Sequence, residues 1–432
     1  MTAKFVKLGQ ISTIDISNVD KKSKDSETEV RLCNFVDVYH NWAITGNIAK
    51  GFMAATANKN QVIRFSVRKG TVAITKDSET RNDIGIPTYI ADDFTDVVLG
   101  YHCALIKPNK TILNGKYLNV ILHTDYAKRY FEANASGSGQ RYTLTNEIIA
   151  GLPIPLLPME EQKRIGELFS NIDKKIENNN AIAAELEGMA KDLYDYWFVQ
   201  FDFPDENGKP YKSSGGKMVW NEELKREIPE GWEARPFSTF AELITKGTTP
   251  TTLGFDYADE GVTFIKVENI GFGSICFDAN RSYISLEANE KMKRSALKYN
   301  DLLISIAGRL GDVAVVPESI LPANTNQAIG IVRLNTPFRP FASYFRQSLM
   351  TEHMRKAMGL ANAQSIQKNL NLENIGDLFF AYSNNTVCKF SLQTQKIYEM
   401  QENLRAENEN LASLRDFLLP MLMNGQVKVK GA

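Results

Sequence analysis

Residues 159–198 read MEEQKRIGELFSNIDKKIENNNAIAAELEGMAKDLYDYWF, and this stretch decides the fold. Its apolar residues recur at alternating spacings of three and four, which is the period of a helix that packs along another helix. The positions of this seam are Ile165, Leu168, Ile172, Lys175, Asn179, Ile182, Leu186, Met189, Leu193 and Tyr196. Pro158 precedes the run, and Glu160 and Glu161 stand where the helix dipole favours acidic side chains. We therefore expect one long helix, roughly 60 Å if it reaches Phe198.

The same pattern recurs 225 residues further along the chain. The matching positions are Phe390, Gln393, Ile397, Met400, Leu404, Glu407, Leu411, Leu414, Leu418 and Met421. A long helix with a narrow apolar seam needs a partner, and the obvious partner is its own repeat. Lys175 and Asn179 interrupt the first seam. Either they reach solvent at a frayed middle, or Asn179 fixes the register of the pair. Pro420 and Gly425 are stop signals for the second helix.

The segments upstream of the two helices also repeat. Residues 69–75 match residues 299–305, each as a turn that leads into an apolar strand. Leu144, Ile149, Leu152 and Ile154 are mirrored by Leu370, Ile375, Leu378 and Phe380. Each copy is therefore a mixed globular block followed by a long amphipathic helix.

The expected fold class is α+β, with two mixed α/β domains in a pseudo-twofold repeat, joined by two long antiparallel coiled-coil helices. The expected segments are a first domain (1–155), a first helix (156–200), a surface linker (201–232), a second domain (233–385) and a second helix (386–425). The linker is expected from its many turn residues.

The composition is that of an ordinary soluble protein, with 432 residues, 43% hydrophobic residues, 23% charged residues and a net charge of -1. Residues 1–150 carry 19 basic against 15 acidic side chains, and residues 235–385 carry 15 against 14. These mildly basic blocks permit contact with nucleic acid but lack the strong basicity of an independent DNA binder. No signal peptide or membrane-spanning run is visible, so we expect a cytoplasmic protein.

The sequence shows no catalytic motif. It has no nucleotide-hydrolysis loop, no dinucleotide-binding fingerprint, no metalloprotease histidine pair and no serine elbow. Cys33, Cys103, Cys276 and Cys388 are too far apart in sequence to suggest a zinc set, and we expect reduced thiols that lie mostly in the core. We therefore expect a protein that is not an enzyme and that holds no metal.

Two long strings carry a family resemblance. Residues 152–165 read LPIPLLPMEEQKRI, and residues 203–232 read FPDENGKPYKSSGGKMVWNEELKREIPEGW. With the block-helix-block-helix plan, they resemble the specificity subunit of type I restriction-modification systems over essentially the full length of the chain. The second copy departs from the pattern, because no proline-rich entry and no Glu-Glu-Gln run precede its helix. The two partner-docking surfaces are therefore not expected to be strictly equivalent.

The resemblance implies a non-catalytic reader of double-stranded DNA. Each target-recognition domain would read one half of an asymmetric bipartite site, and the helices would set the spacing. Two such readers would contact major-groove patches about one duplex turn apart, roughly 34–36 Å. The resemblance also implies that the last helix closes against the start of the chain. The alternative is a solitary DNA-binding or regulatory adapter without a methyltransferase partner.

The same resemblance implies partners and places the cofactors on them. Two methyltransferase subunits would carry S-adenosylmethionine, two restriction-translocase subunits would use ATP and Mg, and this chain would hold no cofactor. The helix residues expected to dock the partners are Ile165, Leu168, Ile172, Leu186, Leu193, Leu411, Leu414 and Leu418.

Base reading needs donors and acceptors on loops, typically Arg or Lys for guanine and Asn or Gln for adenine. In the first block the candidates for DNA contact are Lys76, Arg81, Tyr101, Gln140 and Arg141. In the second block they are Lys246, Thr248, Arg309, Asn326 and Gln327. Each could instead belong to an ordinary capped turn, because glycine and asparagine also make turns that bind nothing. His102 is as compatible with a structural role as with DNA contact, and residues 291–294 suit a solvated helix face or a phosphate contact.

Overall fold

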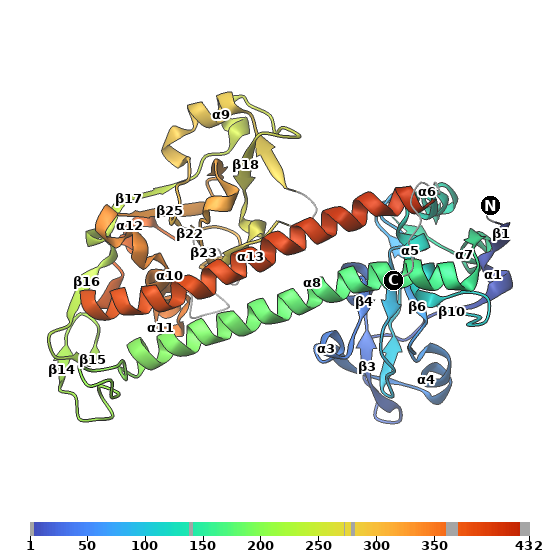
Figure 1. Cartoon of the computed structure of the whole chain (residues 1–432), viewed down its shortest axis with the longest axis horizontal. Coiled ribbons are helices and arrows are strands. Elements are labelled where there is room, and N and C mark those ends of the chain that lie inside the picture. Colours follow the sequence, from blue (N-terminus) through green and yellow to red (C-terminus); the bar gives the residue numbers. More distant parts are fainter. Residues whose placement is uncertain (1–3, 138–140, 272, 278–280, 360–369, 424–432) are drawn as a thin grey trace. The chain divides into compact units, whose positions relative to one another are not determined.

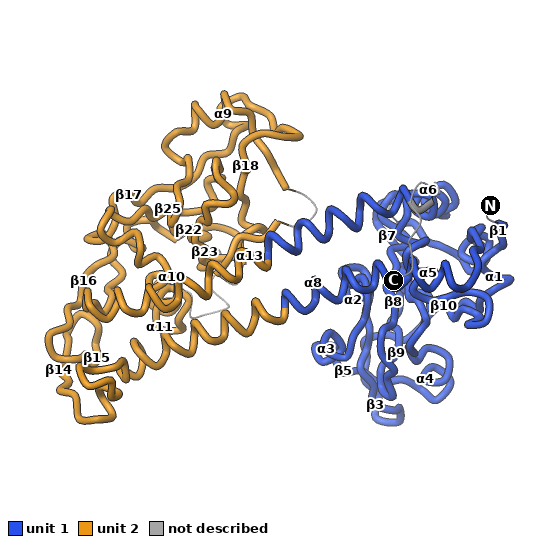
Figure 2. Tube along the Cα trace, in the orientation of Figure 1, with its two compact units in different colours: residues 1–180, 405–432 blue, residues 181–404 orange. Residues whose placement is uncertain are grey.

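The computed structural model of the chain describes residues 4–137, 141–271, 273–277, 281–359 and 370–423, and its contacts divide the chain into two compact units (Figures 1 and 2). Unit 1 comprises residues 1–180 and 405–432, and unit 2 comprises residues 181–404. Two long helices contribute to both units: α8 (Met159–Tyr194), which continues as a π-helical turn over Asp195–Val199, and α13 (Asn384–Met423). The predicted fold class, two mixed α/β domains joined by long helices, is confirmed.

Unit 1 is built around a five-stranded sheet of order β2-β10-β6-β8-β4 and a three-stranded sheet of order β5-β3-β9. Its strands are β1 (Lys4–Lys7), β2 (Ser12–Ile16), β3 (Thr28–Cys33), β4 (Ala43–Ile44), β5 (Met53–Ala57), β6 (Val72–Thr75), β7 (Asp77–Ser78), β8 (Pro87–Ile90), β9 (Val97–Leu99), β10 (Cys103–Pro108), β11 (Ser136–Gly137), β12 (Tyr142–Thr143) and β13 (Pro153–Leu156). Its shorter helices are α1 (Leu8–Ile11), α2 (Phe35–His40), α3 (Gly46–Ala49), α4 (Lys59–Phe65), α5 (Gly115–His123), α6 (Asp125–Asn134) and α7 (Asn146–Gly151). Apolar side chains of the larger sheet, α5, α6 and α7 form one core with Ile165 and Phe169 of α8 and Leu419 of α13.

Unit 2 is built around a four-stranded sheet of order β17-β25-β22-β23 and a three-stranded sheet of order β21-β18-β24. Its strands are β14 (Met218–Asn221), β15 (Arg226–Pro229), β16 (Glu233–Pro236), β17 (Ala241–Lys246), β18 (Val262–Ile265), β19 (Ile270–Gly271), β20 (Ser274–Ile275), β21 (Ser282–Ile284), β22 (Leu302–Ser305), β23 (Val313–Val315), β24 (Ala323–Thr325), β25 (Ile329–Leu334) and β26 (Phe379–Tyr382). Its shorter helices are α9 (Leu286–Lys291), α10 (Ala342–Met350), α11 (Glu352–Ala357) and α12 (Leu372–Gly376). The main core of this unit joins the four-stranded sheet and α10 to Tyr194, Phe198 and Phe390 of the long helices.

The predicted repeat is visible in the hydrogen bonds of the two units. Strand order β2-β10-β6 in unit 1 corresponds to β17-β25-β22 in unit 2. The amide of Lys76 donates to the carbonyl of His102 over 2.8 Å, and the amide of Ile306 donates to the carbonyl of Ala328 over the same distance. The amide of Ser17 donates to the carbonyl of Cys103 over 3.0 Å, and the amide of Gly247 donates to the carbonyl of Ile329 over the same distance. The two domains therefore share one backbone plan although few of their side chains match.

Helices α8 and α13 run antiparallel within each unit. In unit 1, the side-chain amide of Asn179 donates to Glu407 Oε2 over 2.8 Å and to Asn408 Oδ1 over 2.9 Å. In unit 2, the side-chain amide of Gln401 donates to the carbonyl of Ala183 over 2.8 Å. Asn179 is fully buried, which fits its interpretation as a register-fixing residue and not as a snorkelling one.

The predicted seam was only partly right. Ile165, Ile172 and Asn179 are buried, but Ile182 and Met189 are 42% and 59% exposed. Phe169, Ala190 and Tyr194, which were not among the predicted positions, are buried. A helix of 3.6 residues per turn drifts relative to a strict seven-residue repeat, so a seam read as a strict heptad leaves the contact face after a few turns.

Two further expectations need correction. Residues 201–232, predicted as a surface linker, place Phe201, Phe203 and Ile228 in the core of unit 2, because turn residues masked the apolar positions between them. Helix α13 also continues past Pro420 to Met423, while Gly425 lies outside the described residues.

The chemistry of the described residues agrees with an ordinary globular protein. Cys33 and Cys103 are buried and Cys276 is exposed, and all four thiols are free. Within the described ranges, no group of three or more His, Cys, Asp or Glu could hold a metal ion. No helix there is long and apolar enough to cross a membrane.

Candidate nucleic-acid interface

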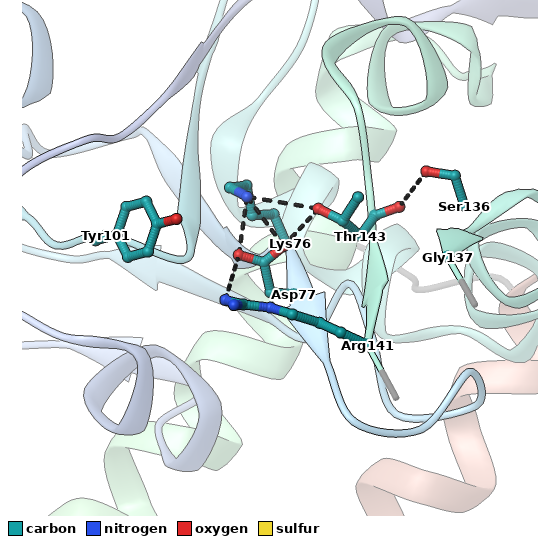
Figure 3. Close-up of a pocket in the computed structure, with 7 residues that line it drawn as sticks. All are labelled: Lys76, Asp77, Tyr101, Ser136, Gly137, Arg141 and Thr143. Carbon is teal, nitrogen blue, oxygen red and sulfur yellow. Dashed lines mark hydrogen bonds and ion pairs between the residues drawn. The ribbon is translucent and has the colours of Figure 1, made fainter. Parts of the chain in front are cut away.

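A cluster of polar side chains in unit 1 lines an open cavity of about 290 Å³ (Figure 3). Lys76 and Asp77 come from the end of β6 and the start of β7, and Arg141 and Thr143 come from the β12 side of the neighbouring hairpin. Tyr101 comes from the turn that precedes β10. Antiparallel pairing of β12 with β7 sets Thr143 opposite Asp77. Local strand pairing therefore gathers residues that lie far apart in the sequence.

Asp77 is the centre of this cluster. Its carboxylate accepts hydrogen bonds from Lys76 Nζ over 2.8 Å and from the Thr143 hydroxyl, and it lies 3.4 Å from Arg141 Nη2. Burial alone would raise the pKa of Asp77, but hydrogen bonds from Lys76, Thr143 and His102 outweigh it and hold its pKa at about 2. The carboxylate is therefore ionised at neutral pH and fixes the cations around it.

His102 completes the cluster in an unusual backbone conformation. Its φ is +74°, in the left-handed region that few residues other than glycine adopt. Its Nδ1 atom lies 2.6 Å from Asp77 Oδ2, and its ring lies 3.9 Å from the ring of Tyr101, centroid to centroid. Tyr101 is 47% exposed, and Lys76 Nζ lies 5.8 Å from the centroid of its ring.

The structure brings together most of the candidates predicted in the first block. Lys76, Tyr101 and Arg141 line the cavity, and the Arg81 guanidinium lies 5.1 Å from the ring centroid of Tyr142 next to it. Lys76 is mostly enclosed, with 13% of its side chain exposed, whereas Arg141 is 56% exposed. Arg141 is therefore the more accessible of these two cations. Gln140 lies outside the described residues.

In unit 2, the loop after β17 lies beside the loop before β25. The amide of Thr248 donates to the carbonyl of Thr325 over 3.0 Å, and the Thr249 hydroxyl bonds the side chain of Gln327. Arg294 Nη2 lies 3.3 Å from the Thr248 hydroxyl. The predicted candidates Lys246, Thr248, Asn326 and Gln327 therefore share one surface, to which the structure adds Arg294.

Gly247 allows this close approach of the two loops. A Cβ atom at this position would lie 2.1 Å from the carbonyl oxygen of Asn326 and 2.3 Å from that of Thr325. No side chain other than hydrogen fits against these backbone atoms.

Arg309 lies on the loop after β22, where its side chain is partly engaged by the protein. Its Nε atom lies 3.2 Å from Asp312 Oδ2, and its Nη2 atom donates to the backbone carbonyls of Val267 and Ile270. Its side chain is 59% exposed. Arg309 therefore stabilises a turn and still presents part of its guanidinium to solvent.

The two candidate surfaces occupy equivalent places in their units. Tyr101 and Asn326 precede the equivalent strands β10 and β25, and Lys76 and Arg309 follow the equivalent strands β6 and β22. The loops at equivalent ends of these strands therefore carry different side chains, as two readers of different sequences require.

Sequence reasoning missed some members of these surfaces. It did not single out Asp77 or Thr143, since nothing local marks a carboxylate that gathers donors from three segments. It considered Arg294 only as a phosphate contact or solvated face. The alternation of charged and hydroxyl residues at 76–81 was the one available signal for Asp77.

The helix residues predicted to dock partners differ in how much of their side chains is exposed. Ile165 and Ile172 are buried inside unit 1 and leave no side-chain surface for another subunit. Leu168 and Leu418 pack partly against the same core, whereas Leu414 is 46% exposed. The remaining three, Leu186, Leu193 and Leu411, are partly buried.

The duplicated mixed domain, the antiparallel helices and the equivalent polar loops define a two-domain recognition subunit built by internal repetition. Residues 2–188 match the family described as Type I restriction modification DNA specificity domain. Beyond that segment, the chain is similar over most of its length to type I restriction enzyme specificity subunits.

The individual relatives have low sequence identity to this chain, but the matches cover most of its length. The chain is 22% identical over 414 residues to the type I restriction enzyme HindI specificity subunit of Haemophilus influenzae, covering 84% of this chain and 87% of the relative. It is 23% identical over 351 residues to the EcoBI specificity subunit of Escherichia coli, covering 70% and 72%. The crystal structure of a type I S subunit from M. genitalium has a TM-score of 0.53 at 15% identity, covering 96% of this chain and 94% of that one. The last comparison supports the fold.

Proposed function

We propose that this chain is the DNA sequence-specificity subunit of a type I restriction-modification complex, and that each recognition domain reads one half of an asymmetric bipartite site. The observation that carries this proposal is the pair of equivalent loop surfaces with unlike side chains. One surface presents Arg141 and Tyr101 around a buried carboxylate, and the other presents Asn326 and Gln327 beside Arg294.

The side chains of the two surfaces suit different bases. An exposed guanidinium is the usual donor to guanine, whereas side-chain amides are the usual partners of adenine. Lys246 and Arg294 are exposed cations of unit 2 and suit phosphate contacts, which position a reader without specifying sequence. Asp77 offsets part of the positive charge of Lys76 and Arg141, and the first block as a whole is only mildly basic, so we expect weak, salt-sensitive DNA binding by the chain alone.

Catalysis belongs to partner subunits in this proposal. Two methyltransferase subunits would supply S-adenosylmethionine, and two restriction-translocase subunits would use ATP and Mg. Exposed apolar side chains on the long helices, Leu414 and Phe417 in unit 1 and Met189 and Leu392 in unit 2, offer surface for the methyltransferases. The complex would act in the cytoplasm, where its DNA substrate is.

Single-molecule sequencing of modified bases tests the proposal. The chain is expressed in cells with its neighbouring methyltransferase subunit, and a strain with the methyltransferase alone is the control. A new split, asymmetric methylated motif is the expected result. A soluble complex that adds no motif would favour the adapter alternative, and tight sequence-specific binding by the lone chain would contradict the division of labour proposed here.

A further inference from the structure

The two recognition domains dock on the long helices through equivalent but chemically different contacts. In unit 1, the Tyr117 hydroxyl donates to the carbonyl of Pro155 over 2.6 Å, and in unit 2 the Tyr344 hydroxyl donates to the carbonyl of Ala381 over 2.6 Å. This shared bond aligns α5 with α10. In this alignment Asn119, two residues after Tyr117, is the counterpart of Arg346, two residues after Tyr344.

Arg346 binds the long helices through a buried ion pair. It is 2% exposed, and its Nη2 atom lies 2.7 Å from Glu187 Oε2 of α8. Its guanidinium carbon lies 4.7 Å from the ring centroid of Tyr398 of α13, and its Nε atom donates to the carbonyl of Gly273 over 2.6 Å. Gln347 adds a bond to Glu187 Oε1 over 3.0 Å. A buried arginine placed this way depends strongly on its carboxylate partner.

Unit 1 uses a cation from the helix instead. The guanidinium carbon of Arg415 in α13 lies 5.0 Å from the ring centroid of Trp42. The Trp42 ring also stacks on the rings of His123 at 3.7 Å and Phe169 at 6.0 Å. The side-chain amide of Asn119 donates to the Trp42 carbonyl over 3.1 Å, the bond that corresponds to that of Arg346 with Gly273. The domain contributes the aromatic group here, and the helix contributes the charge.

The helix residues that face these contacts are therefore not interchangeable. An offset of 225 residues relates the two helices, so Ala412 stands where Glu187 stands and Ala190 stands where Arg415 stands. A second domain moved to the first position would set Arg346 against Ala412 in place of Glu187 and against Asp173 in place of Tyr398. A first domain moved to the second position would set Val120 and Asn119 against a mostly enclosed carboxylate.

We infer that Glu187 and Arg415, with their domain partners Arg346 and Trp42, determine which recognition domain occupies which position on the helices. Each pair ties one domain to its own position on the long helices, so the inference concerns assembly of the chain itself. The inference does not depend on DNA recognition, so it can be tested by measuring the stability of the two domains.

The first experiment is hydrogen exchange of the full-length chain. Glu187→Arg should accelerate amide exchange in α10 at least tenfold and leave α5 unchanged, because only unit 2 contains this pair. The double variant Glu187→Arg with Arg346→Glu should recover part of the protection, because it restores the ion pair but not the bonds to Gly273 and from Gln347. Glu185→Arg, a change of the same charge at an exposed position of the same helix, is the matched control. Unchanged protection of α10 in Glu187→Arg, or a double variant no better than the single one, would overturn the inference.

The second experiment exchanges the domains within the full chain, with residues 4–156 and 233–382 trading places. On unchanged helices we expect a lower midpoint of thermal unfolding and at least tenfold faster exchange in both transplanted helices. A second chimera also exchanges the helix residues, through Glu187→Ala, Ala190→Arg, Ala412→Glu and Arg415→Ala, and should recover most of the protection. Wild-type protection in the first chimera, or no improvement in the second, would refute the assignment.

Discussion

The side-chain nitrogen of Asn179 on α8 lies 2.8 Å from the Glu407 carboxylate on α13, and both residues belong to unit 1. Lys175 lies 3.2 Å from the same carboxylate, so one acidic group joins two neighbouring turns of the opposite helix. This polar contact interrupts the apolar seam at a fully buried position and requires one alignment of the helices.

Asn179→Asp tests that contact. The change replaces a donor to Glu407 by a second carboxylate, so we expect the free energy of unfolding at pH 7 to fall by about 1–3 kcal/mol. The loss should shrink near pH 4, where the carboxyl groups take up protons. Urea unfolding of the full chain measures it, with Asn178→Asp at the exposed neighbouring position as control. An equal loss in both variants would show that the contact contributes nothing specific.

Asp77 predicts a pH dependence of stability. Its pKa in the folded chain is about 2, below the ordinary value of 3.8, so its ionised form stabilises the folded state above about pH 4. That stabilisation is lost as the pH falls from about 4 through 2. Allowing for solvent screening, we expect wild type to exceed Asp77→Asn by about 1–2 kcal/mol at pH 6. Denaturant unfolding between pH 6 and 3 should show the difference narrowing below pH 4, and a constant difference would exclude the ionised carboxylate as its source.

Arg141 predicts the reading of one half-site. Arg141→Ala removes the exposed guanidinium of the unit 1 cluster, so discrimination at one position in one half of the methylated motif should relax by about 1–3 kcal/mol. Sequencing of modified bases measures it, with Arg129→Ala, an exposed arginine of α6 with the same charge change, as control. Relaxation in both half-sites would contradict the assignment of the surface to a single domain.

Gly247 predicts a steric effect in unit 2. Gly247→Ala would force the β17 and β25 loops apart and should lower the free energy of unfolding by about 1–3 kcal/mol. Thermal unfolding measures this, together with loss of reading in the other half-site. Gly188→Ala is the matched control, because a Cβ there has no neighbour within 4 Å and should stabilise the helix by about 0.5–1 kcal/mol. Destabilisation by both substitutions would count against a specific packing role for Gly247.

We expect Leu414 to contribute to binding of the methyltransferase and not to the stability of the fold. Leu414 and Phe417 are 46% and 59% exposed and lie three residues apart, on one side of α13. Leu414→Asp should lower co-purification with the methyltransferase at least tenfold and leave the unfolding midpoint unchanged, since the side chain lies outside the core. Ser413→Asp, at an exposed position of the same turn, is the control. Normal co-purification of Leu414→Asp would place docking elsewhere.

Sequence reasoning reached the fold class because its signals were local. The period of α8 and its recurrence in α13 follow from the side chains of consecutive turns, and the strands β6 and β22 follow from short apolar runs after turns. It did not predict correctly which face of α8 is buried, because it assigned Met189 to the interior although this side chain is exposed. The choice of face depends on the neighbouring domain and helix, which the periodicity of one helix does not specify.

For the candidate surfaces, the sequence pointed to suitable loops but not to their organisation. It identified Lys76, Tyr101 and Arg141 as candidate side chains on turns. It did not predict that the three line one cavity.

The sequence by itself determined two similar domains, two long helices and the loops that carry polar side chains, because spacing and residue type fix local structure. The tertiary structure alone decided that Asp77 gathers its donors, that Gly247 lets two loops touch, and that Arg346 meets Glu187. Thr143 lies 66 positions from Asp77, and Glu187 lies 159 positions from Arg346. Only strand pairing and helix packing in three dimensions bring residues so far apart within hydrogen-bonding distance.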